Sequence, residues 1–431
     1  MDPQRKTATD PESRISFPGW KVVLAGFCGV MVSFVAVVPY TFSLFLKPLS
    51  LAFGWHREAI SAGFSVAALT MGAASPGLGF LLDRWGPRRV ILPCFMVFSL
   101  AYASLALLTP HLIQFYLAFF FIGLVGSGTA FLGYSRAIST WFDRRRGRAL
   151  SIMLAGGACG AMIMPLIAQA AITHYGWRTA FAVLAILPLV VGVPITACFV
   201  REQPEVRERA QIAVDVGESV GKALGGRVMW IIAATVCLSA IGVNGAIAHL
   251  SALLTDRGVS TQGAAYSIAI MGATGLVGRF MIGPFLDRFF GPRIYQAMLL
   301  MAVIGIALLS VARTLATGMT AAALIGLSTG GEADITPYMI SRYFGLKRFS
   351  TLYAFTHTAH ALGAAIGPLF VGWIFDSFGS YRPAAIQLLA LPSFVPCLVM
   401  FLLPRYHPRY EMRKPALLAP IAETPAAEIA Q

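Results

Sequence analysis

The dominant pattern along the chain is a series of long apolar runs separated by short polar turns. Each run has about 20 residues or more, and a helix of about 20 apolar residues crosses a hydrocarbon layer about 30 Å thick. The pattern therefore predicts an all-α membrane protein with twelve transmembrane helices. We expect these helices over residues 20–46, 57–82, 89–108, 112–138, 147–173, 177–199, 228–255, 261–286, 292–312, 316–341, 349–376 and 381–404.

The polar segments divide the twelve runs into two sets of six. The longest internal polar segment, residues 201–227, is the predicted linker between two six-helix bundles over residues 20–200 and 228–404. Residues 1–19 and 405–431 are the expected tails. The first apolar run is too long for the core of a cleaved signal peptide, so we expect it to remain as the first helix.

Composition agrees with this pattern, since the chain is 57% hydrophobic and only 12% charged, whereas soluble domains carry about 25% charged residues. A net charge of +14 raises the possibility of a nucleic-acid partner. With the N-terminus inside, however, 25 of the 33 Lys and Arg residues fall in predicted cytoplasmic segments or at the helix ends beside them. The outer loops and the helix ends beside them hold Lys47, Arg57, Arg178, Arg257, Arg313 and Arg382. This asymmetry predicts a multi-pass protein of a cell membrane, inner or plasma, with both termini in the cytoplasm and no nucleic-acid partner.

A charged turn occurs twice, 204 residues apart. Residues 79–89 read GFLLDRWGPRR, and residues 283–293 read GPFLDRFFGPR with one extra phenylalanine. A second pair follows, WFDRRRG at 141–147 and YFGLKRF at 343–349. Duplicated halves with equivalent turns are typical of two-lobed membrane transporters.

Small residues recur on the two helices that follow the second pair of turns. They are Gly156, Gly160 and Pro165 on one helix, and Gly363, Gly367 and Pro368 on the other. Glycines four residues apart let helices approach closely. Two interpretations remain open: ordinary packing within each bundle, or a surface on which the two bundles rock.

Charged groups inside the apolar runs are expensive, at about 2.5–3.5 kcal/mol each, so each needs a reason. Arg279 stays charged, and its planar guanidinium matches a carboxylate. It is either the substrate-binding cation or half of a structural ion pair. His357 and His360 lie three residues apart, on one helix face. Either can exchange a proton near neutral pH or pack as a hydrogen-bonded core histidine.

Glu332 and Asp334 fall near the middle of one predicted helix, after a Gly-Gly pair. A buried acid without a partner holds a proton more readily than an exposed one. Both residues are therefore candidates for proton coupling, together with His360. The alternative is that they pair with Arg279 or Arg136 as structural contacts. Two residues apart, they cannot both face the same way.

The first charged turn resembles the signature of the major facilitator superfamily, and the second turn repeats it through Asp287 and Arg288. The matching residues are Gly79, Asp83, Arg84, Gly86, Arg88 and Arg89. The resemblance covers nearly the whole chain. It implies two six-helix bundles around a central cavity, with the turns acting as a conformational gate.

A closer resemblance, to the monocarboxylate transporter and oxalate:formate antiporter group, is carried by residues 39–45, Arg279 and residues 343–348. In that group the arginine matching Arg279 holds the substrate carboxylate. The oxalate:formate antiporter has a lysine at the position of His360. Because this chain lacks that second fixed cation, the departure from the group favours a single carboxylate and a titratable site here.

Four further residues are weaker candidates for substrate binding: His249, Tyr40, Tyr338 and Phe131. The resemblance places Tyr40 in the cavity wall. A lone aromatic residue at helical spacing also fits a packing role.

No enzyme site, metal site or cofactor motif emerges, and the six cysteines lack metal-ligand spacing. We expect a monomeric secondary transporter of a small organic anion, most simply a monocarboxylate, coupled to protons or exchanged for a counter-anion in the lipid bilayer. The alternatives are an exporter of a larger amphipathic compound and a membrane sensor that binds without transporting.

Overall fold

The computed structural model describes residues 17–142, 145–201, 218–345 and 348–406, and these residues form helices without any strand. In the first half of the chain the helices are α1 (Gly19–Met31), α2 (Phe34–Phe53), α3 (Arg57–Trp85), α4 (Pro87–Ala106), α5 (Leu112–Thr129), α6 (Phe131–Trp141), α7 (Arg146–Tyr175), α8 (Trp177–Leu187), the π-helix η2 (Pro188–Gly192) and α9 (Val193–Phe199). In the second half they are α10 (Val220–Gly225), α11 (Arg227–Asp256), α12 (Thr261–Arg288), α13 (Gly291–Val311), α14 (Leu315–Phe344), α15 (Phe349–Phe378), α16 (Pro383–Gln387), α17 (Ala390–Val399) and the 3₁₀ turn η5 (Met400–Leu402).

Eleven helical segments among the described residues are long and apolar enough to cross a membrane, and each coincides with one predicted run. The remaining predicted run is α14, a 30-residue helix that carries Glu332, Asp334 and Arg342 and packs against α12 and α13. The prediction of an all-α membrane protein is confirmed. Most of the predicted linker and both tails lie outside the described residues, although α10 falls within the linker range.

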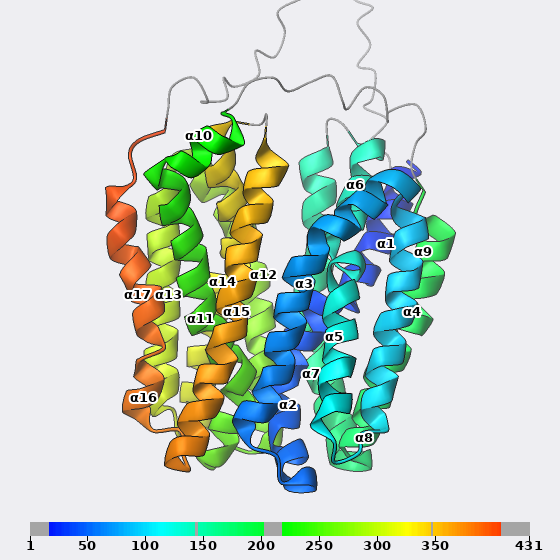
Figure 1. Cartoon of the computed structure of the whole chain (residues 1–431), viewed down its shortest axis with the longest axis vertical. Coiled ribbons are helices and arrows are strands. Elements are labelled where there is room, and N and C mark those ends of the chain that lie inside the picture. Colours follow the sequence, from blue (N-terminus) through cyan, green and yellow to red (C-terminus); the bar gives the residue numbers. More distant parts are fainter. Residues whose placement is uncertain (1–16, 143–144, 202–217, 346–347, 407–431) are drawn as a thin grey trace, which may run out of the picture.

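The helices of the two halves stand side by side, with α1–α9 in one group and α10–α17 in the other (Figure 1). Three helix pairs join the groups, since α3 packs along α15, α7 along α12 and α2 along α11. We name each end of the molecule after the chain segments that lie there. The linker end is where α9 ends and α10 begins, and the far end is where α2 ends and α3 begins.

The repeated turns make equivalent contacts in the two halves. Trp141 donates its indole N–H to the carbonyl of Arg201, 2.7 Å away, which ties the end of α6 to the end of α9. Tyr343 donates its hydroxyl to the carbonyl of Pro404 at 2.8 Å, which ties the end of α14 to the segment after η5. The sequence duplication therefore corresponds to a duplicated packing arrangement.

The small residues of the second repeat pack inside each half. A Cβ added at Gly156 would collide with the carbonyl oxygen of Phe27 on α1, and one at Gly363 would collide with that of Cys237 on α11. The same holds for Gly160 and Gly367, which face Met31 and Ile241. The rocking-surface interpretation of these glycines was wrong, because the absence of a side chain at each one lets two helices of the same half pack closely.

Other glycines lie where the two halves meet. A Cβ at Gly72 would stand 2.7 Å from the Cβ of Ala361, and one at Gly272 would stand 2.6 Å from the backbone of Ala161 and Met162. Close backbone approach across these contacts requires the absence of a side chain. The surface on which the halves meet is therefore lined by glycines that the repeat pattern did not single out.

The first charged turn is a one-residue connection at Gly86, whose φ of +81° favours glycine. In the second copy the extra phenylalanine changes this turn, because Phe289 and Phe290 adopt extended backbone and α13 begins at Gly291. Arg84, Arg88, Arg89 and Arg288 are exposed at the linker end. The side chains of Asp83 and Asp287 lie outside what the structure describes, so their gating role stays a prediction.

Candidate functional site

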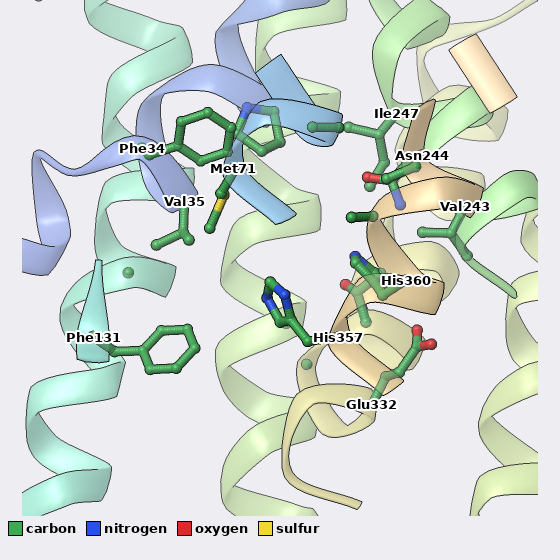
Figure 2. Close-up of a pocket in the computed structure, with 18 of the residues that line it drawn as sticks. Phe34, Val35, Met71, Phe131, Val243, Asn244, Ile247, Glu332, His357 and His360 are labelled. Carbon is green, nitrogen blue, oxygen red and sulfur yellow. The ribbon is translucent and has the colours of Figure 1, made fainter. Parts of the chain in front are cut away.

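A cavity of about 340 Å³ lies between the two halves and is lined by both (Figure 2). The lining residues from the first half are Val30, Phe34, Val35, Pro39, Tyr40, Phe64, Ala68, Met71, Phe131, Leu154, Gly157 and Ala158. Those from the second half are Val236, Val243, Asn244, Ile247, Gly272, Gly275, Arg279, Thr329, Gly330, Glu332, Thr336, Tyr353, Thr356, His357, His360, Ala361 and Ala364. Apart from Tyr40, the polar side chains in this lining come from the second half.

Two helix breaks shape the first-half wall. The sequence predicts continuous helices over 20–46 and 112–138, but the first breaks between α1 and α2 and the other at Ala130. The Phe34 N–H at the start of α2 donates to the Thr129 hydroxyl at the end of α5, 3.3 Å away, and this hydroxyl donates to Gly126 at 2.9 Å. Non-helical backbone at membrane depth is tolerated where it borders a cavity or is buried in protein. Phe34, Val35 and Phe131 flank the breaks and line the cavity.

Arg279 lies on α12 and reaches both halves. Its Nε is 3.2 Å from a carboxylate oxygen of Asp334 on α14. Its Nη1 donates to the carbonyl of Leu154 on α7, 3.3 Å away. The guanidinium is therefore a fixed cation in the cavity wall, held by one acid and one carbonyl. Both interpretations of Arg279 from the sequence fit this geometry, since the guanidinium is half of an ion pair and also borders the cavity.

His357 and His360 both line the cavity from α15, with ring centroids 6.3 Å apart. Their shared helix face is the one that the spacing predicts. Figure 2 shows Phe131 across the cavity from His357. Tyr40 also lines the cavity, close to Arg279 and Thr329 of the other half. The structure thus brings together Arg279, both histidines, Tyr40 and Phe131.

The two acids of α14 have different surroundings, as their spacing requires. Glu332 accepts hydrogen bonds from the Tyr295 hydroxyl at 2.8 Å and from the Ser239 hydroxyl at 3.3 Å. These contacts join α14 to α13 and α11, so Glu332 links helices of the second half while bordering the cavity. Asp334 instead points to Arg279. Asp334 is therefore the acid with direct access to the cavity cation.

Two of the substrate-binding candidates lie away from the cavity. Tyr338 donates its hydroxyl to the carbonyl of Leu286, 3.2 Å away, and packs near Tyr406 toward the linker end. His249 is buried toward the far end and contacts Ser61, Pro368 and Tyr381. Neither belongs to the cavity lining of the described residues, so the substrate-binding interpretation of both is dropped.

His249 belongs to a polar network that joins the halves at the far end. The carbonyl of Pro368 accepts from His249 Nε2 at 3.0 Å, which leaves Nδ1 as the acceptor for the Tyr381 hydroxyl at 2.9 Å. Ser61 of α3 completes the link at 2.9 Å from Nε2.

Ion pairs reinforce this network. Arg57 on α3 donates to Asp256 on α11 at 2.6 Å and to the Tyr381 hydroxyl at 2.7 Å. Lys47 on α2 contacts the same aspartate at 2.6 Å. Asp376 on α15 accepts the backbone N–H groups of Arg57 at 3.1 Å and Glu58 at 2.7 Å, and so caps α3 from the other half. These contacts hold the halves together at the far end.

Several cavity residues escaped the sequence analysis. Asn244 on α11 lines the cavity (Figure 2). Thr329, Tyr353 and Thr356 also belong to the lining. Asn244 could have been found, because an amide in the middle of an apolar run needs a partner. The threonines and Tyr353 carry no comparable signal, since such residues are common in buried helix packing.

Comparison with known proteins agrees with this architecture. MFS-type transporter 1 of Ophiocordyceps sp. (strain BCC 1869) is 25% identical over 383 residues, which is 86% of this chain and 82% of that protein. Monocarboxylate transporter 13 of Rattus norvegicus is 25% identical over 399 residues, 88% of this chain and 90% of the relative. The Fujikurins efflux protein of Gibberella fujikuroi is 29% identical over 216 residues, 48% of this chain and 44% of the relative.

The family model of the Major Facilitator Superfamily matches residues 22–333 and 283–424. These two matches together cover nearly the whole chain, including every helix that lines the cavity. The chain therefore belongs to the Major Facilitator Superfamily, as the charged turn between α3 and α4 had indicated.

Proposed function

We propose that this protein is a secondary transporter of a small organic anion, most simply a monocarboxylate, and that it works by alternating access of the cavity. The observation that carries the proposal is the position of Arg279, a fixed cation in the wall of a cavity between the two halves. A guanidinium binds a carboxylate through two parallel hydrogen bonds, which a neutral cavity wall cannot offer.

The contacts of Arg279 suggest how binding is coupled to movement. Its guanidinium touches Asp334 within the second half and the Leu154 carbonyl of the first half. A substrate carboxylate at Arg279 competes with both contacts. Binding therefore weakens one link between the halves, which gives the ligand a different affinity for different arrangements of the halves.

The same ion pair offers a route for proton coupling. While Asp334 is ionised, it occupies the guanidinium that the substrate needs. A proton on Asp334 removes the competing charge, so proton and anion bind cooperatively, and each raises the affinity for the other. Exchange for a second anion needs only that another carboxylate replace the first at Arg279. We place this activity in a cell membrane, with both termini in the cytoplasm because of the charge asymmetry of the loops.

A second candidate function is export of a larger amphipathic compound. It is favoured by the apolar first-half wall and by the size of the cavity. One relative is named as an efflux protein for fujikurins, and another as a monocarboxylate transporter. Both candidates use the same cavity and differ in the body of the ligand.

The test is uptake into proteoliposomes of purified protein, with a panel of labelled monocarboxylates, dicarboxylates and uncharged amides. We expect saturable uptake of one or more monocarboxylates and little uptake of the matched amides. Uptake is measured with an inward proton gradient, and with unlabelled anion loaded inside. Equal uptake of acids and amides would remove the anion assignment.

A further inference from the structure

The cavity is divided into an apolar side and a polar side. The first-half wall offers aliphatic, thioether and aromatic surface from Val30, Val35, Met71, Phe131 and Leu154. Tyr40 adds a hydroxyl to this wall, but it lies close to Arg279 and Thr329 on the polar side. Figure 2 shows Val35, Met71 and Phe131 on one side of the cavity, with His357 and His360 toward the other.

Such a wall discriminates against polar ligands. A hydroxyl or amide pressed against it loses water without gaining a partner, at a cost of about 1–3 kcal/mol. A second carboxylate there would cost far more, because an unpaired charge leaves water for an apolar surface. The part of the ligand that faces Val35 and Phe131 must therefore be apolar.

The size of the cavity limits how large the ligand can be, and it also shows how much apolar wall a small acid would leave uncovered. Water occupies about 30 Å³ per molecule in the liquid. A cavity of about 340 Å³ thus has room for about ten groups of that size. A two- or three-carbon acid bound at Arg279 would leave much of the first-half wall without a contact.

We propose that the substrate is an amphipathic monocarboxylate, with its carboxylate at Arg279 and an apolar body of about six or more carbons against the first-half wall. This proposal rests on the proposed function of Arg279 and adds the chemical class of the ligand. Val35 and Phe131, which the two helix breaks turn toward the cavity, set the longest body that fits.

The first test measures binding of straight-chain acids from acetate to decanoate to the purified full-length protein in nanodiscs, with matched amides and α,ω-dicarboxylates. Burial of a methylene is worth about a fourfold gain in affinity, so affinity should rise by about that factor per carbon until the cavity is full. Equal affinity for acetate and octanoate would overturn the proposal and leave the proposed function intact. Dicarboxylates that bind as tightly as monocarboxylates of equal length would also overturn it. Amides that bind as tightly as acids would instead overturn the role of Arg279.

The second test uses a variant with a larger side chain in the first-half wall, which reduces the space for the apolar body of the ligand. Val35→Phe should weaken octanoate binding at least tenfold and leave butyrate binding within twofold. Val190→Phe is the matched control, because Val190 on η2 is 65% exposed on the outer surface, and it should change neither. The thermal unfolding midpoint of each variant reports whether it folds. Unchanged octanoate affinity in a folded Val35→Phe protein would overturn the proposal, as would an equal loss for both acids.

Discussion

Arg279 is the residue on which the proposed chemistry depends. Its guanidinium contacts Asp334 and the Leu154 carbonyl, and it borders the cavity. A lysine at this position would keep the charge but lose the planar pair of donors. The strength of substrate binding should therefore depend on the guanidinium group as well as on its charge.

We expect Arg279→Lys to lower kcat/KM for uptake by about 10- to 150-fold, since one hydrogen bond to a charged group is worth about 1.5–3 kcal/mol. Proteoliposome uptake measures this. Arg293→Lys serves as the matched control, because Arg293 is exposed beside Gln296 at the start of α13 and should tolerate the change. Near-normal substrate affinity in a folded Arg279→Ala protein would remove Arg279 from the site.

Asp334 governs the expected pH dependence. It faces Arg279 on α12 and lies near Tyr353 on α15. As pH falls, a proton on Asp334 releases the guanidinium, so wild-type uptake should rise. In Asp334→Asn no carboxylate of α14 competes for the guanidinium at any pH, so uptake should become nearly independent of pH. Glu332→Gln and His360→Gln are compared in the same assay, because both residues border the cavity.

Two results would contradict this assignment. One is a pH profile of Asp334→Asn that matches wild type, which would move coupling to another group such as His360. The other is wild-type uptake that ignores an imposed pH gradient but responds to an anion loaded on the opposite side. The protein would then be an anion exchanger, with the role of Arg279 unchanged.

At the scale of elements, the far-end network controls whether α3 can separate from α11 and α15. Asp376 accepts two backbone N–H groups at the start of α3. Negative charge at a helix N-terminus is favourable, and here the capping carboxylate comes from the other half of the molecule. These contacts must break before the cavity can open at the far end.

Asp376→Ala should favour separation of the halves at the far end. Loss of the cap should cost about 1–3 kcal/mol, enough to shift a two-state balance by about 5- to 150-fold. Spin labels are placed at Leu51 and Leu315 in a cysteine-free background. Pulsed electron–electron double resonance should then show a new, longer distance between the two labels. Glu58→Ala is the control, because the Glu58 side chain is exposed, and alanine keeps the backbone N–H that Asp376 accepts. An unchanged distance distribution in Asp376→Ala would exclude the cap as a latch.

The helix breaks also belong to this scale. The sequence predicts the positions of the first and fourth helices but not their interruptions at Ser33 and Ala130. The break between α1 and α2 is held locally by the Ser33 hydroxyl, which donates to the Val30 carbonyl, and from a distance by the Thr129 hydroxyl, which accepts from the Phe34 N–H. A contact between residues 95 positions apart has no local signature.

At the scale of the whole molecule, the distribution of Lys and Arg predicts the orientation in the membrane. In a cysteine-free background, Lys222→Cys on α10 should react with a membrane-impermeant maleimide only from the cytoplasm. Ser380→Cys, between α15 and α16, should react only from outside. Both positions are exposed. Labelling of position 222 from outside would invert the predicted orientation.

The sequence by itself determined the membrane class, the twelve helical runs and the duplication. These features follow from local hydrophobicity and from the cost of charge in lipid, which each segment expresses on its own. The pairing of His357 with His360 on one face also follows from helix geometry alone.

Only the tertiary structure decided which of these residues meet. Asp334 pairs with Arg279, whereas Glu332 accepts hydrogen bonds from Tyr295 and Ser239. His249 and Tyr338 make their contacts away from the cavity. The tertiary structure also assigned close contact between the halves to glycines outside the repeat. The physical reason is that each of these outcomes is set by the distance between helices far apart in sequence. Periodicity within one helix fixes the face on which a side chain lies, but not the group that it faces.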